Sequence, residues 1–106
     1  MVVDPDAVFH ALADATRRDI LERVIRSGQS VSELARAYPM SFAAVQKHVA
    51  VLERAALVSK TRRGREQIVH GEVETLRRAA RLLDGYEELW RQRAAGIERI
   101  LEEDEQ

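Results

Sequence analysis

The order of patterns between Ser30 and Gly71 constrains the fold of this chain more than any other feature. In Ser30-Val31-Ser32-Glu33 a hydroxyl precedes a glutamate by three residues and apolar residues at helical spacing follow. This pattern predicts a capping box that opens a short helix. The helix ends near Tyr38-Pro39, because a proline disfavours helical geometry in the residue before it. A turn and a longer helix follow, so the segment is typical of a helix-turn-helix.

The second helix of this pair has two chemically different faces. Ser41 is predicted to cap it, and an apolar stripe then repeats at helical spacing to its end near Ala55, with Val45, Val49, Leu52 and Ala56 as its members. The opposite face carries Phe42, Ala43, Gln46 and Lys47 near the helix start, which is the end that a recognition helix inserts into the major groove. Gln46 can pair with adenine, and Lys47 with guanine or a phosphate.

A basic hairpin is predicted directly after this helix. Apolar and polar residues alternate in 57–61 and again in 66–70, on either side of Gly64, which indicates two strands around a glycine turn. Four of the six residues from Lys60 to Arg65 are basic. We expect Arg62, Arg63 and Arg65 to contact phosphates or the minor groove, which positions a protein on DNA without reading sequence.

Each of these pieces also has an interpretation without DNA. A capped helix pair with a short turn occurs in all-helical domains, and a run of charge is usually a solvated loop. The combination of helix, turn, helix and basic hairpin in one order favours a winged helix-turn-helix. The predicted fold class is therefore mainly α with a small β-hairpin, with about five to six helices and a two-stranded wing.

Four motifs of the chain resemble one known family. They are Leu12-Ala13-Asp14-Ala15-Thr16-Arg17-Arg18-Asp19-Ile20-Leu21, Ser32-Glu33-Leu34-Ala35, Val45-Gln46-Lys47-His48-Val49 and Val51-Leu52-Glu53-Arg54-Ala55-Ala56-Leu57-Val58. In this order and spacing they resemble the ArsR-like family of bacterial winged-helix repressors, over roughly residues 6 to 100. The resemblance implies a homodimer that binds a two-fold-symmetric operator and blocks transcription, often of its own gene.

Length and composition are compatible with one such domain spanning 1–106. With 106 residues, 45% hydrophobic and 33% charged, the chain has room for one modest core. Its net charge of −1 argues against DNA binding until four acids in the run 102–105 are set aside, which leaves +3. Without cysteine, a membrane span or a signal peptide, the chain is expected in the cytoplasm.

Residues 1–28 are predicted to form two helices. Asp4-Pro5 opens the first, and a capping box of Thr16 and Asp19 opens the second, whose Ile25 is expected in the core. Arg17 stands in the first turn of that second helix, where its charge opposes the helix dipole. A DNA phosphate or a group within the chain could each satisfy it, and Arg17 is included among the expected DNA contacts.

The C-terminal segment 73–102 is predicted to form dimerisation helices, followed by an acidic tail at 103–106. Gly85 and Gly96 are candidate breaks between helices. One chain of this size has too little surface left to cover the apolar stripe, so a second subunit is expected to bury it, although packing within the chain is the alternative. The expected interface combines this stripe with the first helix: Val8, Phe9, Leu12, Leu83, Tyr86, Leu89, Trp90, Ile97 and Leu101.

No metal, cofactor or catalytic site is predicted. Metal-responsive members of the family carry Cys-Val-Cys-Asp-Leu where this chain has residues 30–34, and serine hydroxyls cannot replace two thiolates for soft metals. The family's second site, on the C-terminal helices, uses histidines, and none follows His70 here. His10 and His70 are expected to be ordinary surface or interface residues, and His48 a hydrogen-bonded structural residue. No phosphate loop or nucleophile motif supports an enzyme.

The predicted function is a sequence-specific regulator that binds double-stranded DNA as a homodimer on a palindromic operator, most simply as a repressor. Ser41, Phe42, Ala43, Gln46 and Lys47 are its expected groove contacts. Two alternatives remain open: a de-repressor that responds to a ligand or metal through a non-thiolate site, and a winged-helix module that binds proteins instead of DNA. Steep weakening of binding with salt would favour DNA.

Overall fold

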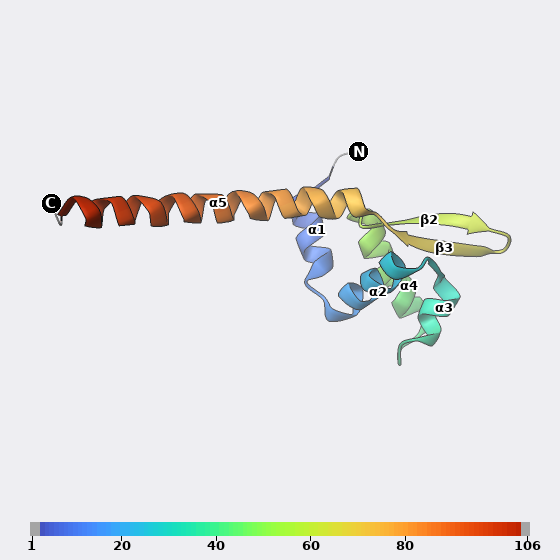
Figure 1. Ribbon diagram of the computed structural model, residues 1–106. Helices are drawn as coiled ribbons and strands as arrows, with labels where there is room; N and C mark the ends of the chain where they lie inside the picture. The colour runs from blue at the N-terminus through green and yellow to red at the C-terminus, as the bar shows by residue number, and fades with distance from the viewer. Residues whose placement is uncertain (1–2, 105–106) are drawn as a thin grey trace. The chain divides into compact units, whose positions relative to one another are not determined.

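The computed structural model describes residues 3–104, in which five helices and three strands follow one another (Figure 1). The helices are α1 (Pro5–Leu12), α2 (Ala15–Arg26), α3 (Val31–Arg36), α4 (Phe42–Arg54) and α5 (Val73–Asp104), and the strands are β1 (Gln29–Ser30), β2 (Val58–Arg63) and β3 (Glu66–Gly71). The chain divides into two units at the Leu76–Arg77 boundary, within α5. This confirms a mainly α fold with a hairpin. Glu105 and Gln106, the end of the predicted acidic tail, lie outside the described residues.

Aspartates cap the first two helices. Asp4 accepts a hydrogen bond from the backbone N–H of Asp6 at 3.0 Å, with Pro5 in the first turn of α1. The N–H of Arg17 donates to Asp14 Oδ2 at 2.9 Å, so α2 begins at Ala15. The capping box predicted for Thr16 and Asp19 is therefore wrong, because an equally good cap stands two residues earlier.

The helix-turn-helix has the predicted caps. The Glu33 N–H donates to Ser30 Oγ at 3.1 Å and the Ser30 N–H donates to Glu33 Oε1 at 3.4 Å, which confirms the capping box. At the end of α4 the N–H of Leu57 donates to Leu52 O at 3.0 Å and Ala56 adopts a φ of 60°. This is a Schellman-type ending with alanine at the left-handed position that glycine usually occupies.

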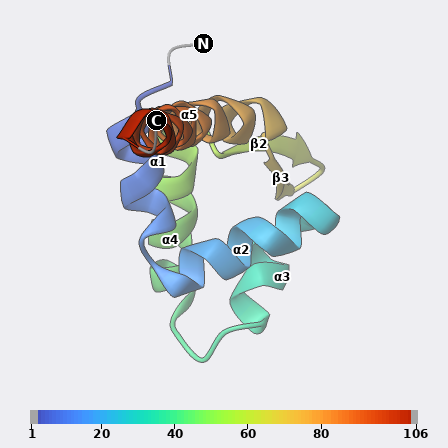
Figure 2. The same ribbon diagram turned by 60° about the vertical axis from the view of Figure 1, so that its left-hand side comes forward.

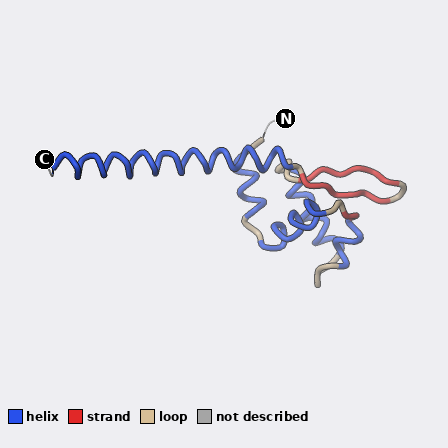
Figure 3. Tube along the Cα trace, viewed as in Figure 1, coloured by secondary structure: helices blue, strands red, loops and turns tan. Residues whose placement is uncertain are grey.

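The strands form one antiparallel sheet in the order β1-β3-β2. In the wing, Arg62 lies opposite Gln67 and Arg63 opposite Glu66, and Gly64 turns the chain with a φ of 63°. Figure 3 shows β2 and β3 as a hairpin that extends away from the helices. The two-stranded wing was expected, but the sheet has a third strand, because the two residues of β1 pair with Ile68 and Val69 of β3.

The core of the first unit lies where α1, α2, α3 and α4 meet one another and the sheet (Figure 2). Its fully buried side chains come from every one of these elements: Val8, Ile20, Leu34, Val45, Val49, Leu52, Leu57 and Val69. Ile25, expected in the core, is 46% exposed instead. This core holds α4 with its apolar stripe inward.

The C-terminal segment is one continuous helix of 32 residues, not several. Gly85 and Gly96 do not break α5, and a side chain at either position would meet nothing within 4 Å. Each glycine costs a helix only about 1 kcal/mol relative to alanine, which a long hydrogen-bonded helix tolerates. Within residues 77–104, α5 therefore offers an unbroken helical surface.

Candidate nucleic-acid interface

The N-terminal half of α4 presents one exposed, mostly polar face. Ser41 Oγ accepts the N–H of Ala44 at 3.1 Å and sets the helix start. The side chains predicted to contact DNA are all exposed: Phe42, Ala43, Gln46 and Lys47. On the other side of the helix, Val45 and Val49 are fully buried. The exposed face is thus held on a helix that the core anchors.

The wing places its arginines in solvent beside this helix. Arg62, Arg63 and Arg65 are all exposed at or next to the hairpin turn. Arg62 Nε donates to Gly64 O at 3.2 Å, which stabilises the turn. Lys60 Nζ lies 3.6 Å from Glu53 Oε1, so the base of the wing is tied to the end of α4. The fourth basic residue of the run is therefore partly neutralised, and the three arginines carry the positive charge of the wing.

A hollow of about 190 Å³ joins the wing to α4. It is lined by Phe42 and Gln46 of α4, Arg65 of the wing and residues of the α3 start, among them Ser32. The structure thus brings two predicted groove residues and one predicted phosphate contact into a single surface. Arg62 and Arg63 do not line this hollow.

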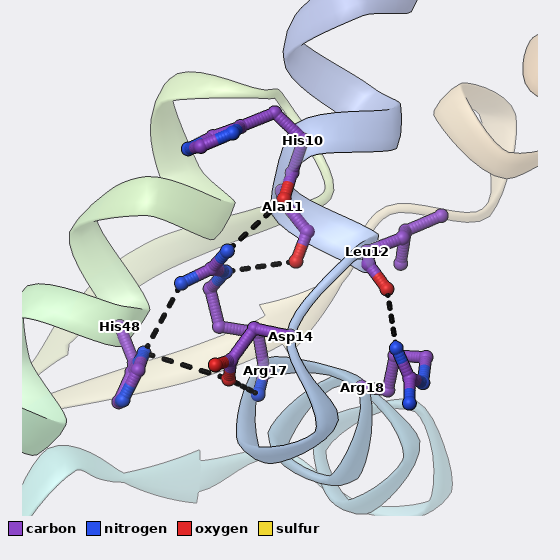
Figure 4. Close-up of polar contacts among 7 residues, drawn as sticks. All are labelled: His10, Ala11, Leu12, Asp14, Arg17, Arg18 and His48. Atoms are coloured by element: carbon purple, nitrogen blue, oxygen red, sulfur yellow. Dashed lines mark hydrogen bonds and ion pairs between the residues drawn. The ribbon is translucent and has the colours of Figure 1, made fainter.

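Arg17 is engaged inside the chain rather than offered to DNA (Figure 4). Its Nε donates to Ala11 O at 2.8 Å and its Nη2 to His10 O at 3.0 Å, at the end of α1. Its Nη1 lies 3.4 Å from Nδ1 of His48 on α4. The carbonyl groups at the C-terminal end of a helix carry partial negative charge, which stabilises the Arg17 guanidinium. Arg17 thus links α1 to the recognition helix, which favours a partner within the chain over the expected DNA contact.

His48 lies in the half-buried space between Arg17 and Asp14. Its Nδ1 is 3.9 Å from Asp14 Oδ2, and its side chain is 22% exposed. The pKa of Asp14 is held below its ordinary value, first by the backbone hydrogen bond from Arg17 and further by the charges of Arg17 and His48. A structural role for His48, as predicted, agrees with these contacts.

Arg18, like Arg17, donates a hydrogen bond to a backbone carbonyl at the end of α1. Its Nη1 donates to Leu12 O at 2.8 Å, so two adjacent arginines satisfy the last carbonyls of α1. Such carbonyls have no partner within a helix. Sequence reasoning missed this pairing; the available signal was a helix without a glycine cap followed within six residues by two arginines.

A second unpredicted cluster ties α2 to the turn of the helix-turn-helix. Tyr38 Oη donates to Asp19 Oδ2 at 2.5 Å, Arg23 Nε donates to the same oxygen at 3.0 Å, and the Arg23 guanidinium lies 5.4 Å from the tyrosine ring centre. Burial and the hydrogen bond to Asp19 raise the pKa of Tyr38 to about 12. The hydrogen bonds from Tyr38 and Arg23 lower the pKa of Asp19.

The residues predicted for a dimer interface differ in their availability. Val8 is fully buried within the chain, so its assignment to an interface is wrong. Phe9 and Leu12 are half-buried. The members on α5 are between 49% and 68% exposed: Leu83, Tyr86, Leu89, Trp90, Ile97 and Leu101. The surface available for a partner therefore lies mainly on α5.

Ser30 and Ser32 stand where metal-responsive members of the family carry their two cysteines. Ser30 is buried and its hydroxyl caps α3, while Ser32 is exposed. Among the described residues no three histidine, cysteine, aspartate or glutamate side chains gather closely enough to hold a metal ion.

None of the helices between residues 3 and 104 combines the length and apolar character needed to cross a membrane.

Comparisons with known proteins match the same parts of the chain. The family described as "Helix-turn-helix domain" matches residues 12–61. The HTH-type transcriptional regulator Rv2034 of Mycobacterium tuberculosis is 50% identical over 54 residues, which are 51% of this chain and 50% of that protein. The match thus spans about half the length of this curated relative.

Two solved structures are similar over most of the chain. An ArsR-like transcriptional regulator from Rhodococcus sp. RHA1 has a TM-score of 0.81 and 36% identity, and the match covers 91% of each chain. A homodimeric winged helix-turn-helix DNA-binding domain of Mb0332 from Mycobacterium bovis has a TM-score of 0.64 and 24% identity over 78% of each chain. The second comparison bears on the fold alone.

Proposed function

Since this chain belongs to the ArsR-like family of winged helix-turn-helix transcriptional regulators, we propose that it binds duplex DNA as a homodimer and represses transcription at its operator. The observation that carries the proposal is the surface shared by α4 and the wing. Exposed polar side chains on α4 lie next to exposed arginines, and a hollow lined by both joins them. A protein that reads DNA needs both base contacts and phosphate contacts.

The two sets of side chains take different parts in this proposal. Gln46 and Lys47 read base edges in the major groove, where a glutamine fits adenine and a lysine fits guanine. Arg63 and Arg62 approach phosphates or the adjacent minor groove, while Arg65, which lines the hollow shared with α4, contacts a phosphate closer to the recognition helix. Ser41 and Phe42 lie at the helix start, where the backbone comes nearest to the duplex.

Self-association is the second part of the proposal. Its support is the exposed apolar surface of α5, which a lone chain in water would leave uncovered. The relative from M. bovis described above is itself homodimeric. A two-fold dimer presents two copies of the α4 face and therefore requires a palindromic operator. Repression follows where such an operator overlaps a promoter, including the promoter of this chain's own gene.

Selection of bound duplexes from a random pool tests the DNA assignment. We expect enrichment of an inverted repeat whose half-sites lie about one helical turn apart, roughly 34 Å. Failure to enrich any sequence would contradict sequence-specific binding and would favour the protein-interaction alternative.

Variants then separate base reading from phosphate contact. Gln46→Ala should reduce the preference for the selected duplex over a scrambled one by about 1–3 kcal/mol, whereas Arg63→Ala should weaken both and lower the salt slope by about 1. The matched controls on α5, Gln92→Ala and Arg99→Ala, remove the same groups from exposed positions and should change neither quantity. Equal effects of Arg63→Ala and Arg99→Ala would contradict a role for the wing.

A further inference from the structure

Outside α5, the described chain exposes two large apolar side chains, Ile25 and Phe42. Ile25 covers the backbone of β3, since a Cβ placed on Gly71 would come within 2.6 Å of its Cγ1. Phe42 is 47% exposed at the first position of α4, on the face that carries Gln46 and Lys47. A single exposed apolar residue is common on protein surfaces, so its surroundings decide whether it has a function.

Phe42 lines a hollow that three parts of the chain enclose. The hollow of about 190 Å³ is bordered by Val31 at the start of α3, by Phe42 and Gln46 of α4, and by Arg65 of the wing. Val31 and Phe42 are its apolar lining residues, and the other lining residues are polar or charged. The surface proposed to face DNA therefore contains a small apolar patch among hydrogen-bonding groups.

The spacing along α4 places Phe42 close to a base-reading residue. Phe42 and Gln46 stand four residues apart, so they lie on the same side of the helix, about 6 Å apart along its axis. Successive bases of one DNA strand are about 3.4 Å apart along the duplex. A helix that places Gln46 on one base pair therefore places Phe42 within about two base pairs of it.

The major groove offers an apolar side chain one group of matching chemistry. Thymine carries a methyl group at C5 there, whereas the other three bases are recognised by their hydrogen-bond donors and acceptors. A phenyl ring has no donor or acceptor of its own, so it would cover the polar edge of a guanine or cytosine without satisfying it. Contact with a methyl group removes two apolar surfaces from water at no such cost.

We propose that Phe42 determines part of the operator sequence by packing against the C5-methyl group of a thymine, within about two base pairs of the base that Gln46 contacts. This inference rests on the proposed DNA binding and specifies one of its base preferences. Val31 contributes to the same contact from α3, because it lines the hollow beside the ring. Each half-site then contains one thymine whose methyl group is required for full affinity.

Replacing thymine by deoxyuridine tests the proposal, because it removes the methyl group and leaves the hydrogen-bonding groups of the base unchanged. Each thymine of the selected duplex is replaced in turn, at the symmetry-related positions of both half-sites, and the dissociation constant is measured. At one position we expect binding weaker by roughly fourfold per half-site, or about fifteenfold for both, the effect of exposing one methyl group at each. Equal affinity of the native protein for all substituted duplexes would overturn the proposal.

Phe42→Ala identifies the side chain that senses the methyl group. The α4 cap depends on the Ser41 hydroxyl and the Ala44 N–H, so this variant keeps the helix start. It should bind the thymine and the uracil duplex with equal affinity, while Phe42→Leu, which keeps an apolar side chain, should still prefer thymine. The matched control Gln46→Ala should retain the full preference. A preference that survives unchanged in Phe42→Ala would overturn the proposal, since the methyl group would then act through another side chain or through DNA shape.

Photochemical cross-linking tests the same contact without a variant. A 5-bromouracil base at the sensitive position carries bromine in place of the methyl group and cross-links to a side chain in contact with it under near-ultraviolet light. We expect mass spectrometry of the native complex to identify Phe42 as the modified residue. A cross-link to the wing instead would overturn the proposal.

The outcomes separate this proposal from DNA binding itself. If the native protein selects no duplex, the proposed function fails. If it selects a duplex in which no thymine methyl group affects affinity, the proposed function stands and the role of Phe42 fails.

Discussion

Helices α4 and α5 are both amphipathic, yet their apolar stripes have opposite fates. In α4 the stripe residues Val45, Val49 and Leu52 are fully buried by the rest of the chain. In α5 the stripe is exposed, and Trp90 reaches 68%. Periodicity alone therefore tells how a helix distributes its apolar side chains, and not which molecule covers them. The covered stripe builds the reading surface, and the uncovered one is available for pairing.

The largest expected effect is on the covered stripe. Leu52→Ala removes a fully buried side chain and should lower the free energy of unfolding by about 2–5 kcal/mol. The matched control Leu89→Ala truncates a side chain that is 62% exposed in the chain. Urea unfolding at several protein concentrations measures both. Leu89→Ala should lower the free energy of unfolding only at protein concentrations at which the chain self-associates. An equal loss of unfolding free energy in both variants at all concentrations would remove the contrast between the helices.

The next effect is on the uncovered stripe. Trp90→Ala should weaken self-association by about 2 kcal/mol or more, roughly thirtyfold in the dissociation constant, because buried tryptophans dominate interfaces. Sedimentation equilibrium measures this change. Arg99→Ala, also exposed on α5 but outside its apolar stripe, serves as the control and should leave the dissociation constant within a factor of about two. Unchanged association of Trp90→Ala would place the interface elsewhere.

A smaller effect is expected at Arg17, which joins α1 to the recognition helix α4 and so helps to hold α4 on the core. Arg17→Ala removes charge-assisted hydrogen bonds to Ala11 O and His10 O and should cost about 1.5–3 kcal/mol of stability. The neighbouring control Arg18→Ala removes one exposed bond and should cost less. The salt slope of DNA binding should stay unchanged in both. A slope lower by about 1 in Arg17→Ala would restore it as a phosphate contact.

The end of α4 offers a stabilising change. Ala56 adopts a φ of 60°, which strains any residue with a side chain. Ala56→Gly should relieve this strain, and part of the gain is lost to the greater entropy of glycine in the unfolded chain. We expect a net increase of about 0.5–1 kcal/mol in thermal or urea unfolding. A destabilised variant would show that the Ala56 methyl group contributes more by packing than it costs in strain.

The smallest effect concerns the pairing of Asp19 with Tyr38. The pKa of Asp19 is lowered in the folded chain from its ordinary 3.8, so its stabilising contribution is present above that value and is lost as pH falls through the lowered pKa. The stability difference between the native protein and Tyr38→Phe should therefore shrink on acidification. Unfolding curves between pH 7 and pH 2 measure it. A difference that does not change with pH would exclude the carboxylate as its source.

Local signals in the sequence predicted much of the first unit correctly. The cap at Ser41, the capping box at Ser30 and the turn at Gly64 depend on residues within three positions, and the structure has all three. The two-residue strand β1 could not be predicted, because it exists only through pairing with β3. The predicted interruptions of α5 were wrong because an isolated glycine weakens a helix without ending it.

The candidate site shows the same division. The exposure of Gln46 and Lys47 followed from helical periodicity around Val45 and Val49. The engagement of Arg17 did not, since its partner His48 lies 31 residues away. Its other partners are carbonyl groups, which carry no sequence signal. Contacts of this kind become visible only when the helices have packed.

Solvent access to Trp90 tests most directly whether a second copy covers the exposed stripe of α5. The chain has a single tryptophan, so its fluorescence reports on this position alone. We predict blue-shifted emission and weak quenching by iodide in the native protein, with a red shift and stronger quenching in Leu89→Ala, in which self-association through α5 is weakened. Fully exposed emission with strong quenching in the native protein, at concentrations that support DNA binding, would contradict the account.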